Sequence, residues 1–143
     1  MPHALSPRLA EIVDALPVTP HAHVLEIGCG PGAAARAVAA RLVTGHVLAI
    51  DRSATAVVQA QANSAKEIAS GRMSVRQAAA EDFALEPGEA PFDIVFAIRV
   101  GALDGRHAAA GQKALTRIAA ALAPGGRMFI DGGQPLREVL IAR

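Results

Sequence analysis

Two hydrophobic patterns alternate along the 143-residue chain, short apolar runs and longer segments with helical spacing. The first helical segment opens with Ser6-Pro7, a pair typical of a helix start, and ends at Pro17. Further helices are predicted over residues 33–42, over residues 53–68 with Ser53 as the cap, and before Pro124-Gly125-Gly126. The apolar runs predict strands at residues 23–27, 46–50, 73–77, 92–98 and 127–131.

Strands that alternate with helices indicate a parallel sheet, because each parallel pair needs a crossover connection. The pattern therefore predicts an α/β fold, a doubly wound and mainly parallel five-stranded Rossmann-like sheet with helices on both faces. The length fits a single domain over residues 1–143.

Composition narrows the possible partners. The net charge of +1 and the absence of Trp and Tyr argue against nucleic acid and against a charged membrane surface. We find no run of about 18 apolar residues that could span a bilayer and no secretion-signal layout at the N-terminus. Together with the lone Cys29, these features predict a cytoplasmic protein.

The turn after the first strand carries the candidate chemistry. Gly28, Gly30 and Gly32 let a ligand approach the backbone, and the following helix presents free N–H groups. Asp51 ends the second strand, where its carboxylate could accept hydrogen bonds from both hydroxyls of a ribose. These features predict a ligand that contains adenosine and one anionic group.

Glu26 distinguishes between two such ligands. Read loosely, the turn also passes the dinucleotide fingerprint, but a carboxylate one residue before Gly28 would repel a pyrophosphate and favour an ammonium group. An adenosine joined to a zwitterionic amino acid satisfies every group, so S-adenosylmethionine is the expected cofactor. A nicotinamide-dependent oxidoreductase stays as a minor alternative.

The motifs resemble those of class I methyltransferases over about residues 5–131. Residues 24–32, Val-Leu-Glu-Ile-Gly-Cys-Gly-Pro-Gly, are similar to the first motif of that family. Residues 49–53, 80–83 and 92–95 resemble the second, third and fourth motifs, and residues 122–128 resemble the turn before the fifth strand.

The resemblance implies the roles of individual residues in cofactor binding. The methionine end would be held by Glu26, Gly28 and Gly30, with Cys29 in the same turn, and Ala97 would pass near it. The ribose would contact Asp51, the adenosine would lie along Arg52, and the adenine would be edged by Ala80 and Glu81. One departure is Ala79, which matches a position where many members pair an aspartate with the adenine amino group.

Family members usually continue past strand five into a helix and an antiparallel hairpin. Here we expect most of that hairpin to be missing, with one short helix over residues 136–142. Strand five would then expose an edge carrying Met128, Phe129 and Ile130. A second copy of the chain, in a homodimer, or the C-terminal segment would have to cover that edge.

The acceptor is predicted mainly by elimination. Strand four lacks both the Asn/Asp-Pro-Pro-aromatic motif of nucleic-acid and glutamine amino methyltransferases and the metal-binding aspartate of catechol-type enzymes. A small-molecule acceptor, methylated in line and without a metal, is the remaining expectation. No catalytic residue is assigned, although Arg99 could bind an anionic substrate and His107 or Asp104 could act as a base. The alternative is a non-catalytic module that binds the cofactor or a partner.

Overall fold

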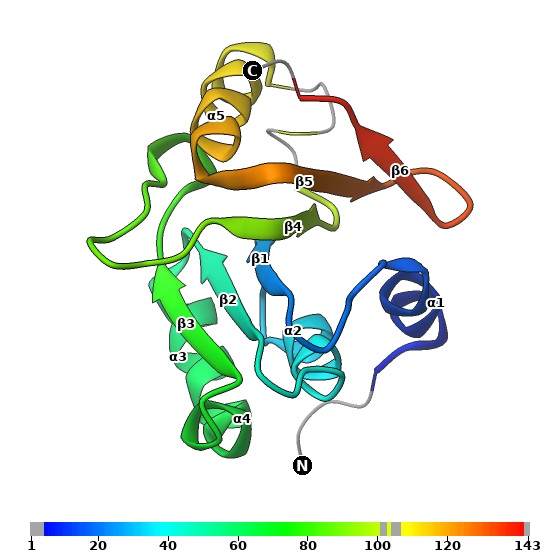
Figure 1. Cartoon of the computed structure of the whole chain (residues 1–143), viewed down its shortest axis with the longest axis vertical. Helices are drawn as coiled ribbons and strands as arrows, with labels where there is room; N and C mark the ends of the chain where they lie inside the picture. The colour runs from blue at the N-terminus through cyan, green and yellow to red at the C-terminus, as the bar shows by residue number, and fades with distance from the viewer. Residues whose placement is uncertain (1–4, 101–102, 104–106, 142–143) are drawn as a thin grey trace.

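The computed structural model describes residues 5–100, 103 and 107–141, which form one six-stranded sheet in the order β3-β2-β1-β4-β5-β6 (Figure 1). The strands are β1 (His23–Ile27), β2 (His46–Asp51), β3 (Met73–Gln77), β4 (Phe92–Ala97), β5 (Leu122–Asp131) and β6 (Leu136–Val139). The helices are α1 (Pro7–Ala15), α2 (Ala33–Ala39), α3 (Ala54–Asn63), α4 (Ala65–Ala69) and α5 (Ala108–Ala121), with a short 3-10 helix η1 (Ala80–Asp82). The first five strands run parallel and β6 runs antiparallel to β5, so the predicted Rossmann-like architecture is confirmed.

Two of the predicted helix starts are confirmed by their capping bonds. The Ser6 hydroxyl accepts a hydrogen bond from the Leu9 N–H at 3.2 Å, and the Ser53 hydroxyl accepts one from the Ala56 N–H at 3.2 Å. The helix predicted over residues 53–68 is divided, however. It breaks at Ser64, whose backbone leaves the helical region and whose side chain is fully buried.

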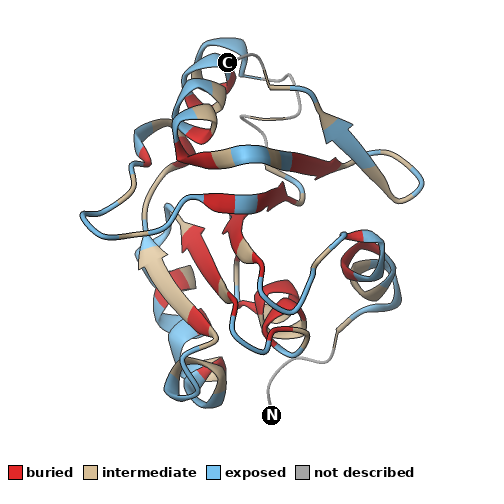
Figure 2. Cartoon of the chain, viewed as in Figure 1, coloured by how far each residue is buried: buried red, intermediate tan, exposed pale blue. Residues whose placement is uncertain are grey.

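The strands alternate their side chains between two apolar layers. Val24 of β1 belongs to the layer beneath α1 and α2, whereas Leu25 belongs to the layer beneath α5. Figure 2 shows the buried residues concentrated on the strands and on the inner faces of the helices. Because Glu26 lies two residues after Val24, its side chain shares the α2 side of the sheet.

The C-terminal segment corrects our prediction. Of the helix expected over residues 136–142, the part from Leu136 to Val139 is a strand, and the sheet has six strands instead of five; Ala142 lies outside the described residues. Residues 132–135 reverse the chain and let β6 pair with Met128, Phe129 and Ile130 of β5. The unpaired backbone of β5 outweighs the helical preference of the segment, because a buried edge needs hydrogen-bond partners. The C-terminal segment thus covers the edge.

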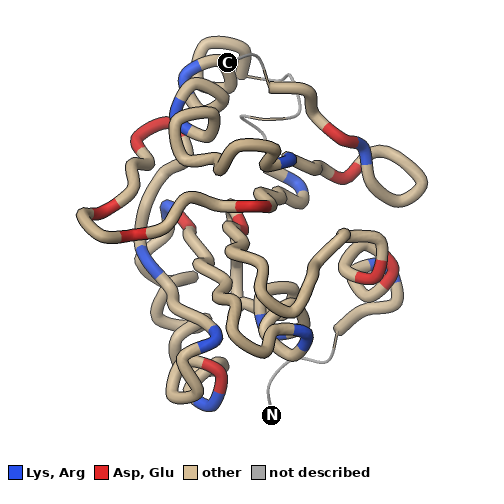
Figure 3. Tube along the Cα trace, in the orientation of Figure 1, with Lys and Arg blue, Asp and Glu red and all other residues tan. Residues whose placement is uncertain are grey.

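Charge is distributed evenly over the fold. Figure 3 shows acidic and basic residues interspersed along the described trace. Within the described residues, no helix is long and apolar enough to cross a membrane.

Candidate cofactor-binding site

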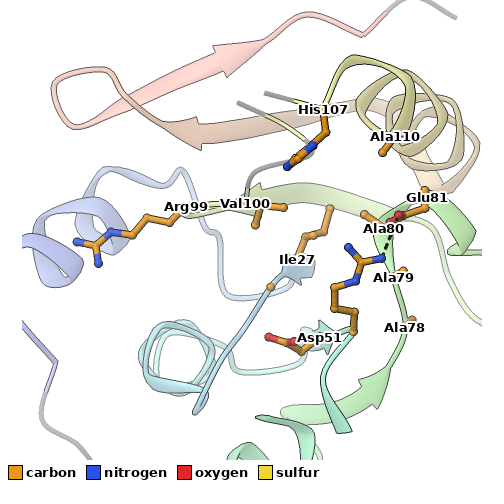
Figure 4. A pocket seen from close by; sticks show the side chains of 12 residues that line it. Ile27, Asp51, Ala78, Ala79, Ala80, Glu81, Arg99, Val100, His107 and Ala110 are labelled. Carbon is orange, nitrogen blue, oxygen red and sulfur yellow. Dashed lines mark hydrogen bonds and ion pairs between the residues drawn. The ribbon is translucent and has the colours of Figure 1, made fainter. Parts of the chain in front are cut away.

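Two cavities lie side by side at the carboxyl ends of the central strands. The first has a volume of about 510 Å³ and lies between Asp51, the segment after β3 and the start of α5 (Figure 4). The second has a volume of about 360 Å³ and lies between the glycine turn and α1. Gly28 and Arg99 line both, so the two cavities meet above the glycine turn.

The side chain of Val100 packs directly on the turn where the two cavities meet. Gly28 has a φ of 72°, and a Cβ atom added there would lie 2.8 Å from Cγ2 of Val100. A larger residue at this position would therefore clash with the segment after β4 and would also be strained in the left-handed region. Glycine at this position lets Val100 pack closely against the turn.

Glu26 lines the second cavity and is 3% exposed. Its Oε1 atom is buried and has no hydrogen-bond partner. Burial raises the pKa of the Glu26 carboxyl to about 8; the hydrogen bond to the Ala35 backbone opposes this shift, Asp51 adds to it and Arg36 opposes it. A buried carboxyl oxygen without a hydrogen-bond partner lowers the stability of the fold, unless a ligand supplies that partner.

Asp51 lines the first cavity and differs from Glu26 in its surroundings. One carboxylate oxygen accepts the Gly30 N–H at 2.9 Å, and the other accepts the Ser53 N–H at 2.9 Å. These bonds connect the tip of β2 to the glycine turn and fix the carboxylate. Each oxygen keeps a further lone pair that can accept a hydroxyl from the cavity.

The sequence matches a known family over this same region. A family model described as a methyltransferase domain matches residues 24–126, which include β1, the glycine turn, Asp51 and most of the sheet. The chain belongs to the methyltransferase domain family. The predicted family resemblance is thereby confirmed.

Individual relatives of this methyltransferase domain include two enzymes. Trans-aconitate 2-methyltransferase of Paracidovorax citrulli is 35% identical over 121 residues, which make up 85% of this chain and 42% of that protein. A solved structure of phosphoethanolamine N-methyltransferase 2 of Haemonchus contortus, in complex with S-adenosyl-L-methionine, is 28% identical with a TM-score of 0.67. The match covers 86% of this chain and 27% of that one.

The fold also occurs in a protein that is named a cyclase and not a methyltransferase. The cyclase SpnF matches with a TM-score of 0.68 at 22% identity, over 86% of this chain and 43% of that chain. This likeness concerns the fold alone. The chain thus spans less than half the length of each of these three relatives.

The residues predicted to bind the cofactor fall into four groups in the methyltransferase domain, according to the cavity that they line. Four line the first cavity: Asp51, Arg52, Ala80 and Glu81. Glu26, Cys29 and Gly30 line the second, and Gly28 lines both. Ala97 lines neither of them; it is 1% exposed and borders a small void that Val100 also lines.

The surroundings of Cys29 and Arg52 determine what these two residues can do in the site. Burial raises the pKa of the Cys29 thiol to about 12, with further contributions from Glu26 and Asp51, so the thiol is protonated at neutral pH and is no nucleophile. The Arg52 guanidinium lies 3.2 Å from the Glu81 carboxylate, and this pair forms one wall of the first cavity (Figure 4). Ala79, the departure from the family pattern, lines the same cavity.

The segment after β4 brings Arg99 to the boundary between the cavities. Arg99 has a φ of 57°, which is unusual for a residue with a side chain, and its N–H donates to the Asp131 carboxylate at 3.0 Å. Its side chain points away from Asp51 and toward α1, where Arg8 lines the second cavity (Figure 4). His107 extends into the first cavity from the opposite side to Asp51, and Asp104 lies outside the described residues.

Sequence reasoning missed several residues that act on the site. Asp131 ends β5 as predicted, and the sequence did not show that its carboxylate also accepts the Arg99 N–H. Arg36, Asn63 and Ser64 contact the glycine turn from the far side. The contacts from Asn63 to Pro31 and from Arg36 to Ser64 join residues 28 or more positions apart, so no local pattern signals them. Among the described residues, no group of three His, Cys, Asp or Glu side chains is placed to hold a metal ion.

Proposed function

We propose that this domain binds S-adenosylmethionine and transfers its methyl group to a small-molecule acceptor that carries a carboxylate. The observation that carries the proposal is the orphan oxygen of the buried Glu26, at one end of a cleft whose other end holds Asp51. The activity, the cofactor and the acceptor are proposals, because the chain covers only part of its relatives.

Glu26 is suited to the amino-acid end of the cofactor. An ammonium group in the second cavity would give Oε1 the partner that it lacks and would favour the ionised carboxylate. A pyrophosphate in the same place would confront a buried acid, which argues against a dinucleotide.

The first cavity is suited to the adenosine end. Asp51 can accept the ribose hydroxyls, since its backbone bonds hold the carboxylate in place without using all its lone pairs. Ala78, Ala79 and Ala80 form a flat apolar wall for a purine, and the Arg52–Glu81 pair closes its edge.

The remaining task of the protein is alignment. When bound, S-adenosylmethionine supplies a methyl group on a positively charged sulfur that is already activated for displacement. Gly28 and Val100, which both line the first cavity, would hold the donor in one orientation, and such positioning contributes up to ~7–11 kcal/mol in related reactions. No metal is part of the proposal, because neither an activated donor nor an ionised carboxylate acceptor requires one.

Charge favours an anionic acceptor. Arg8 and Arg99 both line the second cavity, and neither guanidinium forms an ion pair with another described residue. The carboxylate of the cofactor would neutralise the positive charge of one arginine, and an anionic group on the acceptor would neutralise the charge of the other. A carboxylate with an ordinary pKa near ~4 is ionised at neutral pH and needs no general base. The Paracidovorax citrulli relative is named for methylation of trans-aconitate, a substrate that fits this class.

Two measurements test the proposal in sequence. Calorimetric titration should give tight binding of S-adenosylmethionine and S-adenosylhomocysteine but not of NAD, and Asp51→Ala should weaken the binding at least tenfold. Transfer of a labelled methyl group should then occur to trans-aconitate and not to its trimethyl ester, and Arg99→Gln should raise the KM for trans-aconitate. Preferential NAD binding would overturn the cofactor, and equal transfer to acid and ester would overturn the acceptor class.

A non-catalytic binding module is the second candidate, and Ala79 is the observation that favours it. The first cavity lacks at this position the side chain that pairs with adenine in many family members. Tight S-adenosylhomocysteine binding without methyl transfer to any carboxylate would support this candidate.

A further inference from the structure

The Pro31–Gly32 peptide group, on the outer side of the glycine turn, is held from both sides. Its N–H donates to the Cys29 carbonyl at 3.0 Å. Its carbonyl oxygen accepts the Arg36 Nη1 at 2.9 Å and the Asn63 amide at 3.3 Å. A peptide plane bonded at both ends cannot rotate without breaking one of these hydrogen bonds.

Arg36 joins this peptide to the break between α3 and α4. The same Nη1 atom that donates to Pro31 also donates to the Ser64 hydroxyl at 3.2 Å. Ser64 is fully buried at the break, so the hydroxyl is available to Arg36 because the helix is interrupted there. Both hydrogens of Nη1 are therefore used, and their directions are fixed by the planar guanidinium.

Gly32 shows how closely the parts fit. It has a φ of 91°, and an added Cβ would lie 3.2 Å from Arg36 Nη1, 3.3 Å from the Ala60 methyl group and 3.3 Å from Ser64 Oγ. A glycine at this position allows α3 and the guanidinium to pack directly on the turn.

The inner side of the same turn meets the cavities. Two residues before Gly32, the Gly30 N–H donates to Asp51, and Gly30 lines the second cavity. The Pro31–Gly32 peptide is joined to Gly30 through Pro31 alone, whose ring fixes its φ, so the position of this peptide constrains the path of the chain at Gly30.

We propose that Arg36 is a positioning residue, which together with Asn63 and Ser64 locks the Pro31–Gly32 peptide and so orients Gly30 for the cofactor. The inference rests on the proposed cofactor site, although Arg36 lines neither of its two cavities. We refer to Arg36, Asn63 and Ser64 as the turn clamp.

Arg36→Lys is the test, because lysine keeps the positive charge and lacks the planar guanidinium whose N–H groups point in fixed directions. The expected result is an affinity for S-adenosylhomocysteine weakened about tenfold, the range for hydrogen bonds to a charged group, together with faster amide hydrogen exchange at Gly30 and Gly32. Ser64→Ala should shift both readouts in the same direction and by less.

Arg72→Lys is the matched control. Arg72 is also half-buried, and its Nη1 also makes two hydrogen bonds, to the carbonyls of Val43 and Gly45, each at 2.9 Å, near the amino end of the sheet. Its replacement should lower the denaturation midpoint as much as Arg36→Lys and leave the affinity and the exchange of Gly30 and Gly32 unchanged.

Three outcomes would separate the clamp from the cofactor. Unchanged exchange at Gly30 and Gly32 in Arg36→Lys would overturn the turn clamp, whatever the affinity. Faster exchange at the two glycines with unchanged affinity would overturn its role in cofactor binding. If the unmodified protein binds no S-adenosylhomocysteine, the proposed function fails, and the exchange measurement still decides whether the clamp exists.

Discussion

Two turns that contain glycine follow buried parallel strands at the same end of the sheet, and their roles differ. After β1, residues 28–32 lead into α2 and line the cavities. After β5, residues 132–135 reverse the chain into β6. Both turns contain glycine and proline, so composition alone does not separate them.

The difference lies in what each glycine leaves room for. Gly28 lines both cavities, and its N–H donates to the Ile50 carbonyl of β2 at 2.8 Å. Gly133 faces its own chain, because an added Cβ would lie 2.0 Å from the backbone oxygen of Leu136. The first turn is open toward a ligand, and the second is closed on its own chain. Glycine signals a binding site only where a neighbouring group, here Glu26 or Asp51, supplies chemistry.

Gly133→Ala should give the largest effect on stability and little effect on binding. The added methyl group meets backbone that cannot move without breaking the pairing of β6, so we expect a loss of about 2–3 kcal/mol or more in the free energy of unfolding. Chemical denaturation measures the loss, and calorimetry on the folded protein should give an unchanged affinity for S-adenosylhomocysteine. Gln134→Ala, an exposed neighbour in the same hairpin, is the control and should change neither. A large drop in affinity for Gly133→Ala would mean that the two turns are coupled.

The first turn could be predicted from sequence because its determinants are local. The apolar run of β1, the acid at 26, the glycine spacing and Asp51 lie within a 28-residue span, residues 24–51, and each points to the same use. The caps Ser6 and Ser53 were predictable for the same reason, since a cap and its partner are three residues apart.

The second turn was misread because its determinant is remote. Residues 136–139, Leu-Arg-Glu-Val, suit a helix as well as a strand, and the deciding factor is the free edge of β5. The turn clamp was missed likewise, as Arg36 and Ser64 are 28 residues apart. The packing of Val100 on Gly28 was missed as well, because it depends on how the segment after β4 turns at Arg99.

Glu26→Gln tests the chemistry that sets the first turn apart. The amide keeps the shape but cannot form a charge-assisted bond with an ammonium group, so the affinity for S-adenosylmethionine should fall about 100-fold. The variant itself should be no less stable, because a neutral amide avoids the cost of a buried acid. Calorimetry and denaturation at pH 8 check the two effects. Glu81→Gln is the comparison, and its effect should stay below tenfold because Glu81 already pairs with Arg52. Equal losses for both variants would remove Glu26 from its proposed role.

The pH dependence of stability and of binding should distinguish the turn after β1, which follows Glu26, from the turn after β5. Because burial raises the pKa of Glu26 to about 8, the folded protein holds a proton there that the unfolded chain releases above pH ~4. Stability should therefore decrease as pH rises toward 8, by at most about 1.4 kcal/mol per pH unit from this group, and Glu26→Gln should flatten that slope. The groups that act on this proton are Asp51, Arg36 and the Ala35 backbone, and Arg8 and Arg99 line the same cavity.

An ammonium ligand favours the carboxylate, so binding at pH 7 should release a proton from Glu26. The release is detectable as a binding enthalpy that varies with the ionisation enthalpy of the buffer. Gly133→Ala should retain the release and Glu26→Gln should lose it; a release of equal size in Glu26→Gln would show that the proton comes from another group.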